Sequence, residues 1–183
     1  ETLAANVLNY SFNNAYQGGD GVSLVNASHP IVNGTFSNEL ATAAALSQTS
    51  LEQMLIQIRQ AVDNNGKRIR LTPQKLVLSP SNVFQGEVLL NSVLRAGTAD
   101  NDLNPIKSMG LLAGGQANIC RLTSNTAWWV KTDAPEGLKI VMRRGLEKSM
   151  EGDFETDSMR YKATERYSLG WTDPRAVFGT AGI

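Results

Sequence analysis

The most suggestive chemistry-bearing residues of this sequence form a short glycine run, Gly18-Gly19-Asp20-Gly21. Backbone amides of such a run can surround a phosphate, so a nucleotide site is the first hypothesis to weigh. The run follows a predicted helix rather than a strand, however, and no Lys-Ser/Thr pair comes after it, so neither the P-loop nor the dinucleotide pattern is complete. Glycines also permit the positive φ angles of tight turns. We therefore interpret the run as a turn.

Other candidate groups are few, because the sequence holds one histidine, His29, and one cysteine, Cys120. This count excludes an internal disulfide and any metal centre built on clustered histidines. His29 precedes Pro30 and is interpreted as a solvated or hydrogen-bonding loop residue, and Cys120 as a buried thiol in an apolar strand. Asp100 and Asp102 could act as paired carboxylates in acid–base chemistry, but charged contacts at a loop tip are the favoured interpretation. The sequence thus predicts no catalytic residue, no metal and no cofactor.

Composition narrows the class of protein further. The 183 residues, 42% of them hydrophobic, suffice for one core or for one domain with a smaller companion. Seventeen basic and 17 acidic residues give a formal net charge of zero, which argues against a dedicated nucleic-acid binder. No apolar stretch approaches the roughly 18 residues of a membrane span, so no membrane partner is predicted. The chain begins at Glu1, inside a helical pattern and without methionine, which predicts a truncated chain.

Helical and strand signals alternate over the first two thirds of the chain. Thr49 and Glu52 have capping-box spacing, and Ser79-Pro80 is typical of a helix start. A continuous apolar run predicts that residues 75–78 form a central, buried strand. The predicted helices are 1–16, 49–62 and 79–94, the predicted strands 68–71 and 75–78, and the polar loops 22–45, with one short strand, and 97–108.

The last third is predicted to be mainly β. Strands are expected at 117–122, 127–131, 138–144 and 159–171, and Trp128-Trp129 is interpreted as core with one partly exposed ring. Residues 159–171 alternate between an apolar, aromatic face and a basic, polar face. We expect the apolar face to cover a core, with Glu165 as the one charge on it. Thirteen residues exceed the usual strand length of about 5 to 6, which indicates a spine between domains or subunits.

Charged residues surround this long strand in blocks of opposite sign. Basic and acidic blocks within a neutral chain suit a subunit that meets copies of itself. We therefore predict a subunit interface rather than an active site in this region and at the polar loop. The candidate interface residues are Asp100, Asp102, Arg143, Arg144, Glu151, Asp153, Glu155, Asp157, Arg160, Lys162, Glu165 and Arg166.

Several segments, in order over nearly the whole chain, carry a resemblance to a known family. They are Gly18-Gly19-Asp20-Gly21 with His29-Pro30, Leu55-Ile56-Gln57-Ile58-Arg59 with Gly66-Lys67-Arg68-Ile69, Pro73-Gln74-Lys75-Leu76-Val77-Leu78-Ser79-Pro80, Gly97-Thr98-Ala99-Asp100-Asn101-Asp102, Trp129 with Thr132-Asp133-Ala134-Pro135, and Glu165-Arg166-Tyr167-Ser168-Leu169-Gly170-Trp171-Thr172-Asp173-Pro174-Arg175. Together they resemble the major capsid (coat) proteins of tailed bacteriophages, in particular the Mu-like major head subunits.

The resemblance implies an α+β fold of the Hong Kong 97 type. Residues 1–46 would hold the end of the spine helix and a peripheral-domain loop, residues 47–134 the α/β axial domain, and residues 135–183 the return to the peripheral domain along the long β-strand. The N-terminal arm, the extended loop and the first part of the spine helix of that fold would be absent.

The resemblance also implies a structural function and no enzymatic one. The protein would be a virion component, made in the host bacterial cytoplasm, whose hexamers and pentamers build an icosahedral shell that encloses double-stranded DNA non-specifically. Scaffold and portal proteins would be partners in assembly. The alternatives are an encapsulin-like compartment shell and, from a different class, a small α/β enzyme domain that uses the Gly18–Gly21 loop.

Overall fold

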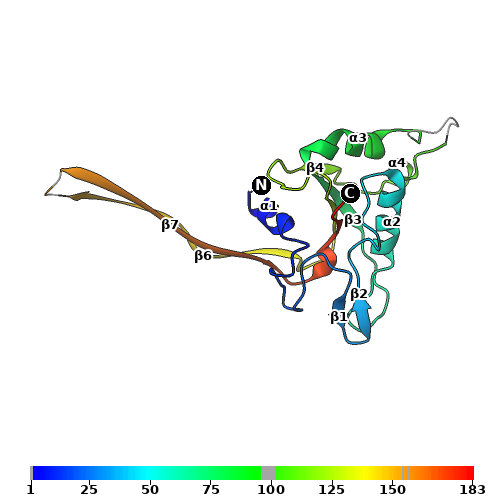
Figure 1. Cartoon of the computed structure of the whole chain (residues 1–183), viewed down its shortest axis with the longest axis horizontal. Coiled ribbons are helices and arrows are strands. Elements are labelled where there is room, and N and C mark those ends of the chain that lie inside the picture. The colour runs from blue at the N-terminus through cyan, green and yellow to red at the C-terminus, as the bar shows by residue number, and fades with distance from the viewer. Residues whose placement is uncertain (1, 96–101, 154, 156) are drawn as a thin grey trace.

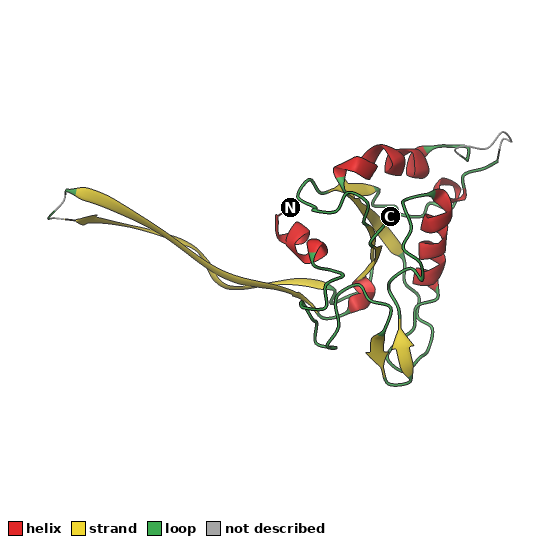
Figure 2. Ribbon diagram, in the orientation of Figure 1, coloured by secondary structure: helices red, strands yellow, loops and turns green. Residues whose placement is uncertain are grey.

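The chain forms a folded body from which a long two-stranded arm projects (Figure 1, Figure 2). This computed structural model describes residues 2–95, 102–153, 155 and 157–183. We call residues 138–171 the arm and the other described residues the body. The helices are α1 (Thr2–Asn9), α2 (Gln48–Arg59), α3 (Val83–Asn91) and α4 (Pro105–Ser108), with 3₁₀ turns at Pro80–Asn82 and Pro174–Ala176, and the strands are β1 (His29–Ile31), β2 (Gly34–Phe36), β3 (Pro73–Leu78), β4 (Gln116–Asn118), β5 (Trp128–Thr132), β6 (Leu138–Asp153), β7 (Ser158–Trp171) and β8 (Val177–Thr180).

A four-stranded mixed sheet lies at the centre of the body, in the order β4-β3-β5-β8. Strand β3 runs parallel to β4 and antiparallel to β5, and β5 is antiparallel to β8. The predicted central strand is confirmed, because β3 has a neighbour on each side and Leu76 and Leu78 are completely buried. The body is therefore α+β, as the sequence predicts.

Both faces of this sheet are covered, which explains the two adjacent tryptophans. Trp128 lies on the face that packs against α2, while Trp129 lies in the core cluster formed with α1. The indole N–H of Trp128 donates to the backbone oxygen of Ala44 at 3.1 Å, and that of Trp129 donates to the hydroxyl of Ser11 at 3.1 Å. Both rings are buried, so the expected partly exposed ring is not found. Successive residues of a strand point to opposite faces, and here each face meets a helix.

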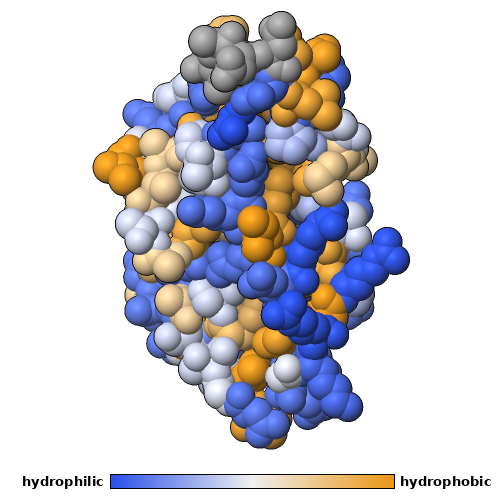
Figure 3. Space-filling model, turned by 90° about the vertical axis from the view of Figure 1, so that its right-hand side faces the viewer, coloured by the Kyte–Doolittle hydropathy of each residue, from blue (hydrophilic) through white to orange (hydrophobic). Residues whose placement is uncertain are grey.

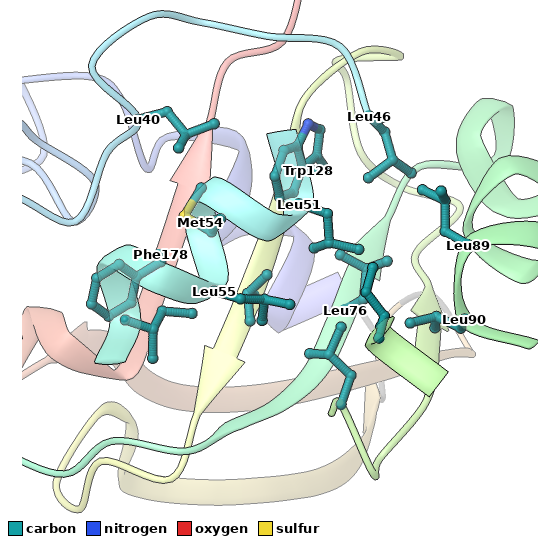
Figure 4. Packing of buried hydrophobic residues seen from close by; sticks show 14 of the residues in the cluster. Leu40, Leu46, Leu51, Met54, Leu55, Leu76, Leu89, Leu90, Trp128 and Phe178 are labelled. Carbon is teal, nitrogen blue, oxygen red and sulfur yellow. The ribbon is translucent and has the colours of Figure 1, made fainter. Parts of the chain in front are cut away.

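Helix α2 supplies the larger core cluster. Leu51, Met54 and Leu55 point from it toward Leu76 and Phe178 of the sheet (Figure 4). The capping box that starts the helix lies two residues before the predicted one. Its N-cap is Ser47, and the Ser50 hydroxyl accepts from the backbone N–H of Ser47. Serine can fill both positions, so the Thr49 and Glu52 spacing was a false signal.

Several predicted elements are shorter than expected. Helix α1 ends at Asn9, α3 ends at Asn91, and β4 ends at Asn118. Because β4 ends there, Cys120 lies in the following turn and is exposed, which corrects the predicted buried strand thiol. Residues 68–71 form no strand, and only Arg68 makes an isolated bridge. The 22–45 segment carries two short strands, β1 and β2, in place of the single one expected.

Candidate assembly surfaces

The arm is an antiparallel hairpin of β6 and β7. Its pairing runs from Leu138 opposite Trp171 at the base to Asp153 opposite Ser158 at the outer end. A 16-residue strand spans about 50 Å, and Figure 1 shows the arm extending away from the body for most of that length. The long strand predicted at 159–171 is confirmed as β7, whereas β6 continues nine residues beyond the predicted end at Arg144.

One face of the arm is apolar, and it is exposed. Cross-strand partners share a face, so the register places six pairs on this side. They are Leu138–Trp171, Ile140–Leu169, Met142–Tyr167, Lys148–Ala163, Met150–Tyr161 and Gly152–Met159. Met150 is 61% exposed and Tyr161 76% exposed, so the prediction that this face covers a core is wrong. We call these pairs the arm's apolar face.

The reason lies in the shape of the molecule. A two-stranded sheet exposes both faces unless another layer covers it, and the arm projects beyond the body (Figure 2). Only the base of the apolar face meets a helix. There Leu169 and Trp171 line a pocket of about 360 Å³ with Val7 and Tyr10 of α1 and its end. Along the outer part, none of the described elements forms a second layer.

The opposite face of the arm carries charges of both signs. Arg144 lies directly across from Arg166, and Glu151 directly across from Arg160. Like charges in directly opposed positions destabilise a hairpin. Arg144 has a distant partner in Glu147, with Nε 3.8 Å from Oε2, whereas Arg166 has no ion pair among the residues that the structure describes. The predicted basic and acidic blocks therefore share one hairpin, in which Arg144 and Arg166 place like charges opposite each other.

Two register shifts interrupt the pairing near the middle of the arm. They lie between Met142 and Arg144 and between Arg144 and Glu147. At the first shift Arg143 is an extra residue on β6, and at the second shift residues 145 and 146 of β6 lie opposite the single residue Glu165 of β7. Such bulges bend and twist a strand pair. Glu165 lies opposite the second shift and is exposed, so its carboxylate pays no desolvation cost. By strand parity Glu165 is the one charge that β7 places on the apolar face, as predicted, and Lys148 of β6 adds a charge of opposite sign to that face.

The other predicted interface residues occupy the outer arm and the polar loop. Lys162 pairs across from Ser149, and Glu155 and Asp157 lie in the turn beyond Asp153. Asp102 is exposed on the body, and its backbone oxygen accepts from the Arg95 N–H at 2.8 Å. Asp100 lies outside the described residues. The structure thus gathers ten of the twelve predicted residues on the arm and leaves Asp102 apart from them.

A buried polar cluster that sequence reasoning missed holds the body beneath the arm. His29 is 1% exposed; its Nδ1 lies 2.6 Å from Asp20 Oδ2, and its Nε2 lies 3.0 Å from Asn38 Oδ1. The Asn38 amide nitrogen donates to the carbonyls of Leu24, Pro174 and Val177. Its Oδ1 must therefore accept, and His29 Nε2 donates. We call Asp20, His29 and Asn38 the histidine clasp; the predicted solvated loop histidine is wrong, although its hydrogen bonding is confirmed.

Arg175 extends this cluster to the point where the arm returns to the body. Its guanidinium and Nε donate to the Val62 carbonyl at 2.6 Å, to Asn64 Oδ1 at 3.0 Å and to Asp173 Oδ1 at 3.2 Å. It also lies 5.0 Å from the centre of the Phe36 ring. The contacts to Val62, Asn64 and Phe36 join segments more than 100 residues apart, so no local pattern could have revealed them.

The cavity beside the clasp offers no catalytic arrangement. It has a volume of about 540 Å³, and Asp20, His29 and Arg175 line it. Both ring nitrogens of His29 are already engaged, and the described residues contain no cluster of metal-ligating side chains. The Gly18–Gly21 run is a turn, as predicted, closed by the Gly21 N–H donating to the Gly18 carbonyl at 3.1 Å. The clasp therefore serves the fold.

Comparison with known families decides which class of protein carries this arm. A family model described as phage capsid protein matches residues 1–179. The chain belongs to this phage capsid family. The family is one of structural proteins rather than enzymes, and membership implies the virion as the place of action. No helix among the described residues has the length and apolar character to cross a membrane.

Solved structures and curated sequences add little to this assignment. The chain is similar to the virus-like particle from Pyrococcus furiosus, with 12% identity over 78% of this chain and 55% of that one, at a TM-score of 0.46. It is also similar to a structure described as Mycobacterium phage Che8, with 14% identity over 78% and 52%, at the same TM-score. This chain spans about half the length of each. A search of curated proteins found no match.

Proposed function

We propose that this capsid-family chain is a wall subunit of an icosahedral phage head, of the Hong Kong 97 type and the Mu-like subgroup. The carrying observation is the arm, which leaves an apolar face of six cross-strand pairs exposed. A two-stranded hairpin is marginally stable in water, so a surface of this kind calls for a covering partner. The subunit would form hexamers and pentamers around double-stranded DNA, assembled with scaffold and portal proteins in the bacterial cytoplasm.

The proposed partner of the arm is a second copy of the chain. Arg166 has no ion pair among the described residues and Arg144 has only the distant Glu147 carboxylate, while Glu151, Glu155 and Asp157 concentrate negative charge at the outer end. Copies that lie side by side can place one arm's acidic end near another arm's basic middle. Because the chain is neutral, subunits that associate this way build up no long-range repulsion.

The proposed domains follow from the same assignment. Residues 47–134 would be the axial domain, and residues 1–46 with 135–183 the peripheral one. Strand β8 of the last segment pairs with β5 of the middle one. Such pairing supports two parts that share one sheet rather than two independent units.

Electron microscopy of the purified full-length protein tests the proposal. We expect closed shells, and small particles of uniform subunit size would contradict it. DNA inside shells purified from infected cells supports a phage head, whereas shells that hold protein cargo would favour the encapsulin-like alternative. Small particles with saturable nucleotide binding would favour the enzyme alternative based on Gly18–Gly21.

The variant Arg166→Glu tests the role of the arm within this proposal. Arg166 is exposed, so the melting temperature should change little. The yield of assembled shells should fall, because the introduced carboxylate would repel the acidic outer end of the neighbouring arm. Shells that form normally, or a variant that no longer folds, would remove Arg166 from the interface. The matched control is Lys67→Glu, an exposed charge reversal on the body.

A further inference from the structure

Helix α3 presents an exposed apolar knob. Phe84 is 84% exposed and Val88 44% exposed, and their spacing of four residues puts them on the same side of the helix. Glu87 lies beside them, and among the described residues its carboxylate accepts from two neutral amides, those of Asn91 at 2.5 Å and Gln116 at 3.0 Å. The knob is therefore aromatic at its centre and negative at its edge.

A groove of complementary character lies between α2 and α4. It has a volume of about 300 Å³, and its lining includes the buried residues Leu55 and Ile106 together with the exposed Ile56 and Met109. A cavity of about 150 Å³ with an apolar lining already holds benzene, so this groove is large enough for one aromatic ring. Figure 3 faces the side of the body on which α2 lies and shows hydrophobic patches between hydrophilic ones.

The groove also has a charged end. Arg59 lines it on the last turn of α2, about two helical turns from Glu52 at the other end. Among the described residues Arg59 has no carboxylate within ion-pair distance, whereas Glu52 accepts from the Gln48 amide at 2.8 Å. Glu87 beside the knob and Arg59 beside the groove are therefore complementary in charge.

Within one chain the knob cannot reach the groove. Lys107 of α4 donates to the Asn91 carbonyl at 2.6 Å, so α4 lies against the C-terminal end of α3, and Phe84 lies at the other end. Helix α3 runs along the top of the body and α2 down its right-hand side (Figure 1). The two surfaces thus belong to different sides of the molecule.

We propose that Phe84 of one copy inserts into the α2–α4 groove of the next copy, with Glu87 paired to Arg59 of that groove. The inference rests on the proposed function and specifies its contacts. A knob and a groove on different sides of the same chain make a head-to-tail contact, and such contacts close into rings when the rotation allows. A buried aromatic anchor with a charged rim is the usual anatomy of a strong interface centre.

Directed disulfide cross-linking tests this contact. In a Cys120→Ser background, which removes the exposed native thiol, the double variant Val88→Cys, Met109→Cys keeps the Phe84 anchor and should give a ladder of linked chains under mild oxidation. Each single variant should give at most a linked pair. The control Val32→Cys, Met109→Cys moves the first thiol to a residue that is 76% exposed on the far β1–β2 hairpin, and it should give no ladder.

Charge exchange supplies a second, independent measurement. Glu87→Arg and Arg59→Glu should each lower the yield of linked chains by up to about fivefold, as expected of a rim ion pair, and the two together should restore it. Phe84→Ala should weaken association by at least ~30-fold without lowering the melting temperature. Shells or oligomers that form while the ladder and these effects are absent would overturn the knob-and-groove contact alone. A wild-type chain that never associates would overturn the proposed function with it.

Discussion

In the central sheet Trp128, Val130 and Phe178 are completely buried, whereas in the arm Met150 and Tyr161 are more than half exposed. Both regions contain antiparallel strand pairs that carry large apolar side chains. They differ in what lies over them, since helices cover both faces of the sheet and no described element covers the outer arm. The comparison shows that a strand's alternation specifies which side chains share a face, while the burial of that face depends on a second layer.

The largest expected contrast is between an aromatic residue of each region. Trp128→Ala should lower the free energy of unfolding by about 3 to 5 kcal/mol, because it leaves a large cavity and an unpaired Ala44 carbonyl. Tyr161→Ala should change it by less than about 0.5 kcal/mol, because the ring is 76% exposed. Urea unfolding of both variants measures the difference. Equal losses would show that the arm is packed in the isolated chain.

Much of the fold follows from the sequence, and the reasons for the misses are physical. Local patterns located α2, β3, β5 and β7. A continuous apolar run marked β3, and the alternation of apolar and polar residues marked β7. The alternation in β7 also predicted a buried face, because the sequence pattern of an apolar face is the same whether its partner lies in the same chain or in another one. The sequence also named ten arm residues as an interface, and their interface role stays a prediction.

The histidine clasp shows the other limit of sequence reasoning. Asp20, His29 and Asn38 are each nine residues from the next, a spacing that matches neither the helix nor the strand period. Their partners include Pro174 and Val177, 136 and 139 residues further on. Only the folded chain brings these groups together, so a lone histidine before a proline carried no usable signal.

The clasp gives the second prediction, which concerns the body beneath the arm. Asn38→Ala should lower the free energy of unfolding by about 2 to 4 kcal/mol, since it leaves His29 Nε2 and three backbone carbonyls without their partner. The matched control Asn33→Ala changes an exposed residue of the β1–β2 turn and should cost little. Thermal unfolding of the two variants measures both. A neutral Asn38→Ala would mean that the clasp does not hold the body.

A pair of glycines sharpens the comparison between sheet and arm. A Cβ on Gly179 of β8 would lie 2.5 Å from Trp129 Cδ1, so Gly179→Ala should cost about 1 to 3 kcal/mol through overpacking. A Cβ on Gly170 of β7 would meet nothing within 4 Å, so Gly170→Ala should be neutral or slightly stabilising. Chemical denaturation of both proteins checks the difference. A larger loss at Gly170 would indicate close packing on the arm that the structure does not contain.

The smallest expected effect depends on pH. Burial raises the pKa of the Glu39 carboxyl above its usual value, so the folded chain holds this proton more tightly than the unfolded chain does. The associated stability is present below the unfolded pKa and is lost as the pH rises through the folded one. Glu39→Gln should therefore match the wild type in acid and exceed it at pH 8 by under about 1 kcal/mol. A variant that is less stable than the wild type at pH 8 would contradict this.

Hydrogen exchange of the arm before and after assembly tests the central claim most directly. In the isolated chain we expect the backbone amides of β6 and β7 beyond Met142 to exchange much faster than those of β3 and β5, because an uncovered hairpin opens readily. In assembled particles the same arm amides should become protected while β3 and β5 change little. Arm amides that are as slow as β5 in the isolated chain, or that stay fast in the particles, would contradict the claim that the arm is an assembly element.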